Sequence, residues 1–223
     1  MAGNPAAETC ACVRGSSTIS ECIVARVADG PNPTEMVRGY LQGLFPMDEP
    51  GSPGPVAWYR TDQRAVILPT EARVPRTVRR MLRRRGYAIR VDSAFGEVVQ
   101  GCGGDRAGEW LTPRLRDAYL ALHGAGIAHS VEAWSGDVLA GGLFGIWIGR
   151  FVSAESMFHR LPDGGNAALA GLLGLAWSSG AELIDVQMCS PHVARFGARE
   201  VAHEEFLRML TRALTPPPPV PGT

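Results

Sequence analysis

The spacing of apolar and polar residues divides the chain into short strands and amphipathic helices. Three segments with strand-like alternation, 128–134, 138–147 and 151–158, are joined by turns that contain Gly136 and Gly149, which predicts an antiparallel meander. Shorter strands are predicted at 65–68 and 87–91 and within the apolar run 182–187. Apolar residues at helical spacing predict a helix at 36–41, capped by Thr34, and further helices at 76–85, 95–100, 112–122, 166–179 and 203–214.

A meander followed by a helix, one more strand and a final helix is typical of an α+β protein, in which helices pack on a sheet. No apolar period is sustained before residue 33, so we expect 1–32 to be a weakly ordered lead. The prolines at 216–219 predict an extended, Pro-rich tail at 215–223.

Composition and charge exclude several classes of protein. The chain has 22 basic and 22 acidic residues, so its overall field does not demand a nucleic-acid partner. It shows neither an apolar run long enough to cross a membrane nor a secretory signal, so we expect a cytoplasmic protein with no membrane partner. Its five cysteines lack metal-ligand spacing, and no Walker loop or dinucleotide fingerprint occurs. We therefore expect free thiols, no metal and no cofactor.

One predicted helix concentrates positive charge. Between Pro75 and Gly86, Val78, Met81 and Leu82 form a thin apolar stripe, and arginines cover the rest. A solvated helix face is the ordinary interpretation of such a run. Like charges at this spacing repel one another unless an anion neutralises them, so we favour contact with nucleic-acid phosphates. The candidate contacts are Arg76, Arg79, Arg80, Arg83 and Arg84.

The predicted strand at 183–187 carries an acid and an amide where a core strand normally carries neither. Because side chains alternate along a strand, Leu183, Asp185 and Gln187 share one face. A carboxylate in apolar surroundings is costly unless it is paired or has a chemical role. Asp185 is therefore either a strand-end residue bonded to nearby backbone amides or a member of a reactive site.

Eight short segments follow one another between residues 33 and 210: GLFP (43–46), RAV (64–66), EWLT (109–112), AHSVE (128–132), GGLFG (141–145), ESMF (155–158), LIDVQ (183–187) and FGARE (196–200). In this order they resemble the bacterial leucyl/phenylalanyl-tRNA–protein transferases. Each segment is short, but the ordered set is specific.

The resemblance implies a fold and a reaction. It implies a small N-terminal α/β domain, 33–88, and a C-terminal domain with the acetyltransferase-like (GNAT) fold, 89–214. An apolar amino acid would pass from aminoacyl-tRNA to the N-terminal Arg or Lys of a protein, forming an amide without ATP. The catalytic residues would be Asp185, Gln187 and Glu155, and the substrate-binding residues Tyr40, Met47, Trp110, Leu143, Val152 and Ser156.

Aminolysis of an ester needs a neutral amine, a stabilised oxyanion and a proton for the leaving oxygen. By analogy Asp185 would position or deprotonate the acceptor ammonium, as a base or as an electrostatic anchor, and Gln187 would hold the amine or ester. Glu155 would bind an ammonium, or else form a salt bridge with an arginine. Trp110 would stack on the terminal adenosine, or else pack in the core.

The chain departs from the family pattern where substrates are recognised. Met47 replaces a tryptophan, and Val152 replaces a phenylalanine that often lines the side-chain pocket. Strict alternation would put Val152 and Glu155 on opposite faces, so both line the site only if a β-bulge lies between them. The alternatives are transfer to a small-molecule amine in a biosynthetic pathway and a non-catalytic tRNA-binding relative; an acyl-CoA acetyltransferase is disfavoured. We expect a monomer.

Overall fold

The computed structural model describes residues 19–21, 30–51, 54–103 and 110–215. The predicted lead and tail lie mostly outside these residues, as do Cys10, Cys12 and Cys22. None of the helices in the described part of the chain is both long enough and apolar enough to span a membrane.

A seven-stranded mixed sheet forms the main body, in the order β10-β4-β9-β8-β7-β6-β5. β8 and β9 are parallel, and the other neighbouring strands are antiparallel, which confirms the predicted meander β6-β7-β8. The strands are β4 (Gln63–Ile67), β5 (Ala88–Val91), β6 (Ala128–Ser135), β7 (Val138–Ile148), β8 (Phe151–His159), β9 (Leu183–Gln187) and β10 (Arg199–Ala202).

A smaller antiparallel sheet has the order β1-β3-β2, formed by β1 (Ile19–Glu21), β2 (Phe45–Met47) and β3 (Ala57–Thr61). β3 leads into β4 across Asp62 alone, so a strand from the segment 33–88 enters the main sheet. The division into domains at residue 88 stays a prediction.

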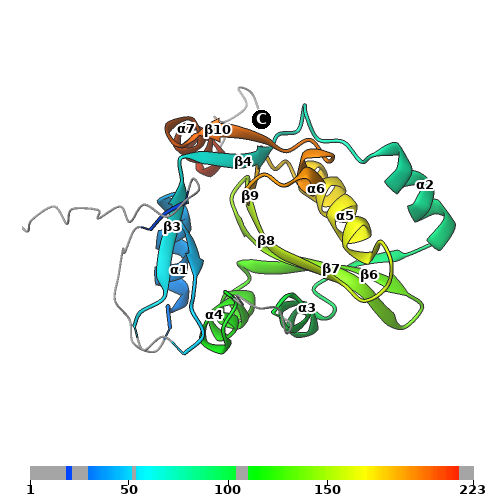
Figure 1. Ribbon diagram of the computed structural model, residues 1–223, viewed down its shortest axis with the longest axis horizontal. Coiled ribbons are helices and arrows are strands. Elements are labelled where there is room, and N and C mark those ends of the chain that lie inside the picture. The colour runs from blue at the N-terminus through cyan, green and yellow to red at the C-terminus, as the bar shows by residue number, and fades with distance from the viewer. Residues whose placement is uncertain (1–18, 22–29, 52–53, 104–109, 216–223) are drawn as a thin grey trace, which may run out of the picture.

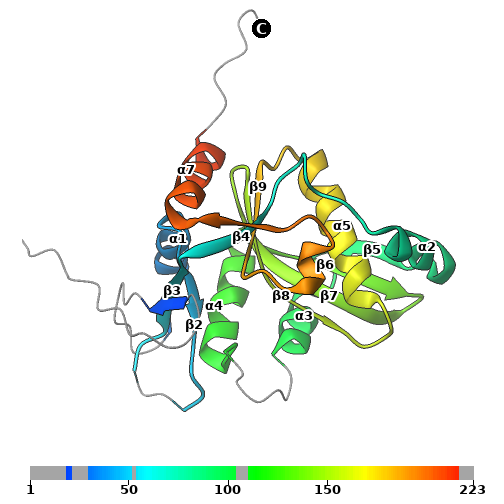
Figure 2. The same cartoon turned by 45° about the horizontal axis from the view of Figure 1, so that its top comes forward.

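Helices cover both faces of the main sheet (Figure 1). The face against α5 is lined by Val131, Leu143, Val152 and Ile184, whereas Phe144 packs on the opposite face toward α3 and α4. Figure 2 shows α1 and α7 at one end, α2 at the other, and β4 running from the first end into the middle. The helices are α1 (Pro33–Leu41), α2 (Arg76–Arg85), α3 (Phe95–Cys102), α4 (Pro113–Gly124), α5 (Gly164–Ser178), α6 (Pro191–Ala194) and α7 (His203–Leu214).

This architecture confirms the α+β class, but the expected cap of the first helix is wrong. Asn32, not Thr34, caps α1: Asn32 Oδ1 accepts from the Glu35 amide at 3.1 Å, and Glu35 Oε2 accepts from the Asn32 amide at 3.0 Å. This reciprocal capping box satisfies two backbone donors at the helix start, and Pro33 fits the first helical position.

Candidate active site

A buried ion pair lies at the centre of the molecule, where β4 and β9 are neighbours. Arg64 Nε and Nη2 donate to Asp185 Oδ1 and Oδ2 at 2.9 and 2.6 Å. The exposed fractions of the two side chains are 1% and 0%. The Arg64 guanidinium lies between the rings of Phe45 and Phe206, 4.6 and 4.7 Å from their centroids. A fork-like pair between two aromatic faces fixes the carboxylate of Asp185 in one orientation.

Asp185 also fixes the backbone of the next site residue. Its Oδ1 accepts from the Gln187 amide at 2.9 Å, and Gln187 adopts the left-handed conformation, with φ of 55°. Such a conformation is uncommon for a residue with a side chain and needs support from its surroundings. The Arg64–Asp185 pair provides it, so the Gln187 side chain is positioned indirectly by Arg64.

Glu155 is the extra residue of a β-bulge in β8. Ala154 pairs with Gly145 and Ser156 with Phe144, which leaves Glu155 between them without a partner on β7. Gly145 permits this arrangement, because a Cβ there would lie 2.2 Å from the carbonyl oxygen of Ser153. Glu155 lies on the same face as Ser153, as alternation along the strand dictates, and the Ser153 Oγ lies 2.6 Å from Glu155 Oε1.

A chain of hydrogen-bonding groups runs from the small-sheet end of the molecule through Glu155 to Gln187. Tyr40 and Tyr119 have their hydroxyl oxygens 2.7 Å apart, and Tyr119 donates to Glu155 Oε2 at 2.8 Å. Ser153 Oγ lies 2.8 Å from the side-chain amide of Gln187. Residues from α1, α4, β8 and β9 thus converge on one carboxyl group.

Burial has the largest effect on the pKa values of these hydrogen-bonded groups. It raises the pKa of Glu155 to about 7, although hydrogen bonding with Ser153, Tyr40 and Tyr119 acts to lower it, and the charge of Asp185 raises it further. Burial also raises the pKa of Tyr40 and Tyr119 well above the usual range, so both hydroxyls stay protonated at neutral pH. A carboxyl with a pKa near neutrality can both release and accept a proton under working conditions.

The structure does not bring every expected substrate-binding residue to this cluster. Leu143 and Val152 are buried on the opposite face of the sheet, packed with the residues under α5. The bulge in β8 is present, yet Val152 and Glu155 lie on opposite faces of the sheet. Ser153 pairs with Asp185 across the strands, so the cluster occupies the face of Ser153, and Val152, the residue before it, points the other way. A role for Leu143 and Val152 in an amino-acid pocket stays a prediction.

The remaining candidates lie on the cluster's face. Met47 and Trp110 are half-buried and pack against the core that contains Tyr40, and the Trp110 carbonyl accepts from the amide next to Met47, that of Asp48, at 3.1 Å. Ser156 is half-buried opposite Phe144. Tyr40 itself is buried, with an exposed fraction of 1%, and its hydroxyl is hydrogen-bonded to that of Tyr119.

Sequence reasoning missed three members of the cluster as site residues: Arg64, Tyr119 and Ser153. Arg64 lies 121 positions from Asp185 along the chain, so no local spacing reveals the pair. Ser153 stands two residues before Glu155, and this serine–x–glutamate spacing was the one local signal.

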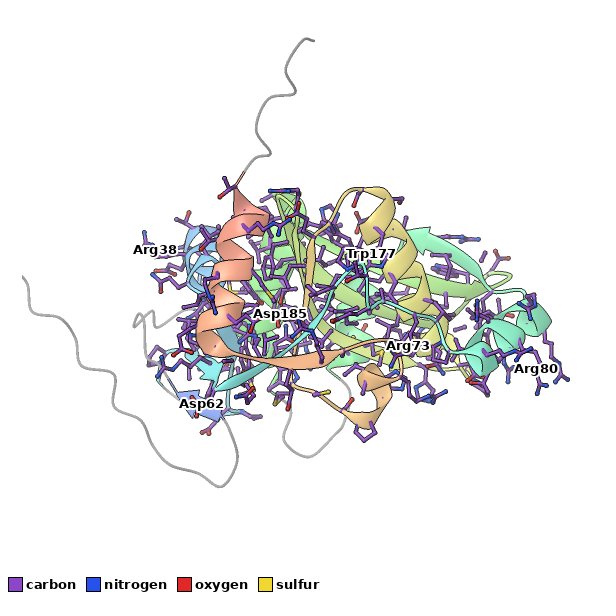
Figure 3. The ribbon with its side chains drawn as sticks, turned by 90° about the horizontal axis from the view of Figure 1, so that it is seen from above. Arg38, Asp62, Arg73, Arg80, Trp177 and Asp185 are labelled. Carbon is purple, nitrogen blue, oxygen red and sulfur yellow. The ribbon has the colours of Figure 1, made fainter. Side chains whose placement is uncertain are left out.

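The arginine helix α2 lies far from the cluster. Figure 3 shows Asp185 among packed side chains in the middle of the molecule and Arg80 at its outer end. The arginines of α2 are exposed, and Arg85 pairs with Asp163 at 3.4 Å. Arg80 and Arg84 line a surface hollow of about 340 Å³, together with Thr77, Met81 and Arg85. In the described part of the chain, no carboxylate lies within ion-pair distance of Arg80 or Arg84.

Comparison with known proteins supplies the family. The model of the leucyl/phenylalanyl-tRNA protein transferase family matches residues 66–211. The leucyl/phenylalanyl-tRNA–protein transferase of Anaeromyxobacter sp. (strain K) is 42% identical over 189 residues, covering 83% of this chain and 80% of that protein. Its counterpart in Laribacter hongkongensis (strain HLHK9) is 39% identical over 200 residues, covering 88% and 84%. Among solved structures, L-PGS from Bacillus licheniformis is similar with a TM-score of 0.45 and 11% identity, covering 69% and 65%. The chain belongs to the leucyl/phenylalanyl-tRNA–protein transferase family.

Proposed function

We propose that this protein transfers an apolar aminoacyl group, leucyl or phenylalanyl, from tRNA to the N-terminal amine of an acceptor protein. The relatives that match most of the chain carry this activity in their names. The observation that carries the proposal is a partly exposed carboxyl, Glu155, with a pKa raised to about 7 beside a rigidly held amide, Gln187. Ester aminolysis needs such a proton-exchanging group next to a fixed hydrogen-bonding group.

We infer that Asp185 is an anchor and not the base. Both of its oxygens are taken, Oδ1 by Arg64 and the Gln187 amide and Oδ2 by Arg64. Its side chain has no exposed surface, so an incoming ammonium has no access to it. Its role is to hold Gln187 in the left-handed conformation that directs the amide side chain into the site.

Glu155 is then the group that exchanges protons. During transfer the amine nitrogen forms a bond with the ester carbon, and the bond from that carbon to the ribose oxygen breaks. One proton leaves the nitrogen and one reaches the ribose oxygen, so a single carboxyl that gives and then takes a proton balances the reaction. A half-buried carboxyl with a pKa of about 7 suits both steps.

The two ends of the aminoacyl-tRNA would occupy separate surfaces. The arginines of α2 would contact phosphates of the tRNA body, because most of them are exposed without a protein counter-charge in the described residues. Met47 and Trp110, both half-buried on the face that carries Glu155, would contact the terminal adenosine. Leu143 and Val152 are buried under α5 on the other face of the sheet, so they would shape the side-chain pocket only from behind the strands that carry Glu155 and Asp185.

The aminoacyl-tRNA donor implies a cytoplasmic location, and we propose that the protein acts there as a monomer. A protein N-terminal Arg or Lys is the proposed acceptor. A small-molecule amine is the alternative, because Met47 and Val152 depart from the family pattern in the substrate regions.

A transfer assay tests the proposal. Radiolabelled aminoacyl-tRNAs are supplied to the enzyme with a protein that has an N-terminal Arg, and separately with an extract of small amines. We expect leucyl or phenylalanyl label in the protein fraction, reduced at least tenfold by Glu155→Ala and unchanged by Glu204→Ala, which removes an exposed carboxylate from the first turn of α7. Label confined to small amines, or bound tRNA without product, would contradict it.

A further inference from the structure

The side-chain amide of Gln187 fits its site in two orientations that differ by exchange of oxygen and nitrogen. In one, Nε2 faces Ser153 Oγ at 2.8 Å, and Oε1 faces backbone carbonyl oxygens. In the other, Nε2 donates to the carbonyls of Ala154 and Val186 at 3.0 and 3.2 Å, and Oε1 accepts from Ser153 Oγ at 2.8 Å. A carbonyl cannot donate, so the second orientation alone satisfies the amide.

This orientation determines where the hydroxyl proton of Ser153 lies. A serine hydroxyl has one proton and two lone pairs. When that proton is directed to Gln187 Oε1, the Oγ atom presents a lone pair to Glu155 Oε1, 2.6 Å away. Two acceptors at that distance would repel, so a proton must lie between them, and Glu155 must supply it.

We propose that Glu155 rests as a neutral carboxylic acid that donates to Ser153, and that Ser153 is the positioning residue that couples this proton to the orientation of the Gln187 amide. Every bond of the chain then runs in one direction, from Tyr40 through Tyr119, Glu155 and Ser153 to Gln187 and the two backbone carbonyls. An ionised Glu155 would require Ser153 to turn back toward it and would leave Gln187 Oε1 without a donor.

The groups around Glu155 favour the neutral form. Tyr40 on α1 and Tyr119 on α4 are uncharged at neutral pH, because burial raises the pKa of both phenols. The negative charge of Asp185 on β9 raises the pKa of Glu155, and the cation that would compensate it, Arg64 on β4, is turned to Asp185 in the fork-like pair. Burial in turn disfavours the charged form of Glu155.

This inference rests on the proposed function for its chemical meaning. A resting acid would deliver its proton to the leaving ribose oxygen as the ester bond breaks, and would recover one from the attacking amine. Gln187 Oε1 accepts from Ser153 and keeps a second lone pair, which could accept an N–H of that amine. Glu155 would therefore not hold an ammonium by charge before transfer begins.

Infrared difference spectroscopy on the free protein, without tRNA, tests the inference. The spectrum of the wild type minus that of Glu155→Gln at pH 6–7 should contain the carbonyl band of a protonated carboxylic acid, which disappears as the pH is raised. Removal of its acceptor by Ser153→Ala destabilises the acid form, so the midpoint of this band should fall by about one pH unit. A midpoint that rises would mean that Ser153 donates to an ionised Glu155, which overturns the proposal.

Two further variants keep the result decisive. Gln187→Met frees the Ser153 proton to turn toward Glu155, so the midpoint should again fall; a rise would contradict the proposal even where Ser153→Ala does not fold. Ser130→Ala is the matched control, because Ser130 stands two residues before Glu132 and donates to that carboxyl, and neither residue belongs to the hydrogen bonds from Tyr40 to Gln187. This variant should leave the Glu155 band unchanged. A wild-type enzyme without transfer activity would refute the proposed function and leave this band intact.

Discussion

Removal of the Arg64 guanidinium is the perturbation with the clearest expected magnitude. Arg64→Met keeps an unbranched apolar stem between Phe45 and Phe206, but it leaves the carboxylate of Asp185 fully buried with one remaining donor, the Gln187 amide. Breaking a buried, hydrogen-bonded ion pair from one side costs about 3–5 kcal/mol, because an uncompensated charge stays inside the protein. Domains are stabilised by about 5–15 kcal/mol, so this is a large share of the total.

Equilibrium unfolding in urea measures the effect. With a slope of about 1–3 kcal/mol per molar urea, the midpoint for Arg64→Met should fall by about 1–5 M. The double variant Arg64→Met with Asp185→Leu removes both charges, and it should recover most of the lost stability while transfer activity stays low. A single variant that loses less than about 1 kcal/mol, or a double variant less stable than Arg64→Met, would refute the account of a charge pair that anchors Gln187.

Three further predictions concern the surfaces and strands around the cluster. Replacement of the α2 arginines with Ala should weaken tRNA binding and reduce the slope of log K against log salt by about 0.7–0.9 per lost phosphate contact; an unchanged slope would show that α2 faces away from tRNA. The variant carries Ala at Arg79, Arg80, Arg83 and Arg84. Val152→Phe should shift the preferred amino acid toward smaller side chains, and an unaltered profile would remove Val152 from the pocket. Gly145→Ala places a methyl group against the Ser153 carbonyl and should cost about 1–3 kcal/mol and displace the Glu155 bulge; wild-type stability together with wild-type transfer would contradict that role.

Periodic segments were the part of the fold that could be read from the sequence. α7 follows the apolar pattern because one of its faces is buried over several turns, whereas β6 and β7 are apolar over most of their length because both faces of the sheet are covered. β2, β3 and β10, with three, five and four residues, were not predicted, and β2 contains Pro46. These strands depend on pairing with a neighbour: β10 pairs with β4, and β2 pairs with β3.

The candidate site divides in a similar way. Asp185 and Gln187 stood out as polar residues in an otherwise apolar strand, and Glu155 and Tyr40 followed from the family resemblance. Arg64 did not stand out, because its partner lies on a strand that is distant in sequence and the pairing register brings them together. A β-bulge was foreseen as the condition for Val152 and Glu155 to share a face. The bulge that forms at Glu155 leaves them on opposite faces, and its place depends on the close approach that Gly145 permits in the neighbouring strand.

Mass spectrometry of one acceptor peptide tests the central claim most directly. A peptide with a free N-terminal Arg and its N-acetylated twin are incubated with the enzyme and a full set of aminoacyl-tRNAs. The account predicts that the free peptide gains the mass of one leucyl or phenylalanyl residue on its α-amine and that the acetylated twin gains none. An unmodified free peptide, in the presence of intact aminoacyl-tRNA that the enzyme binds, would contradict it.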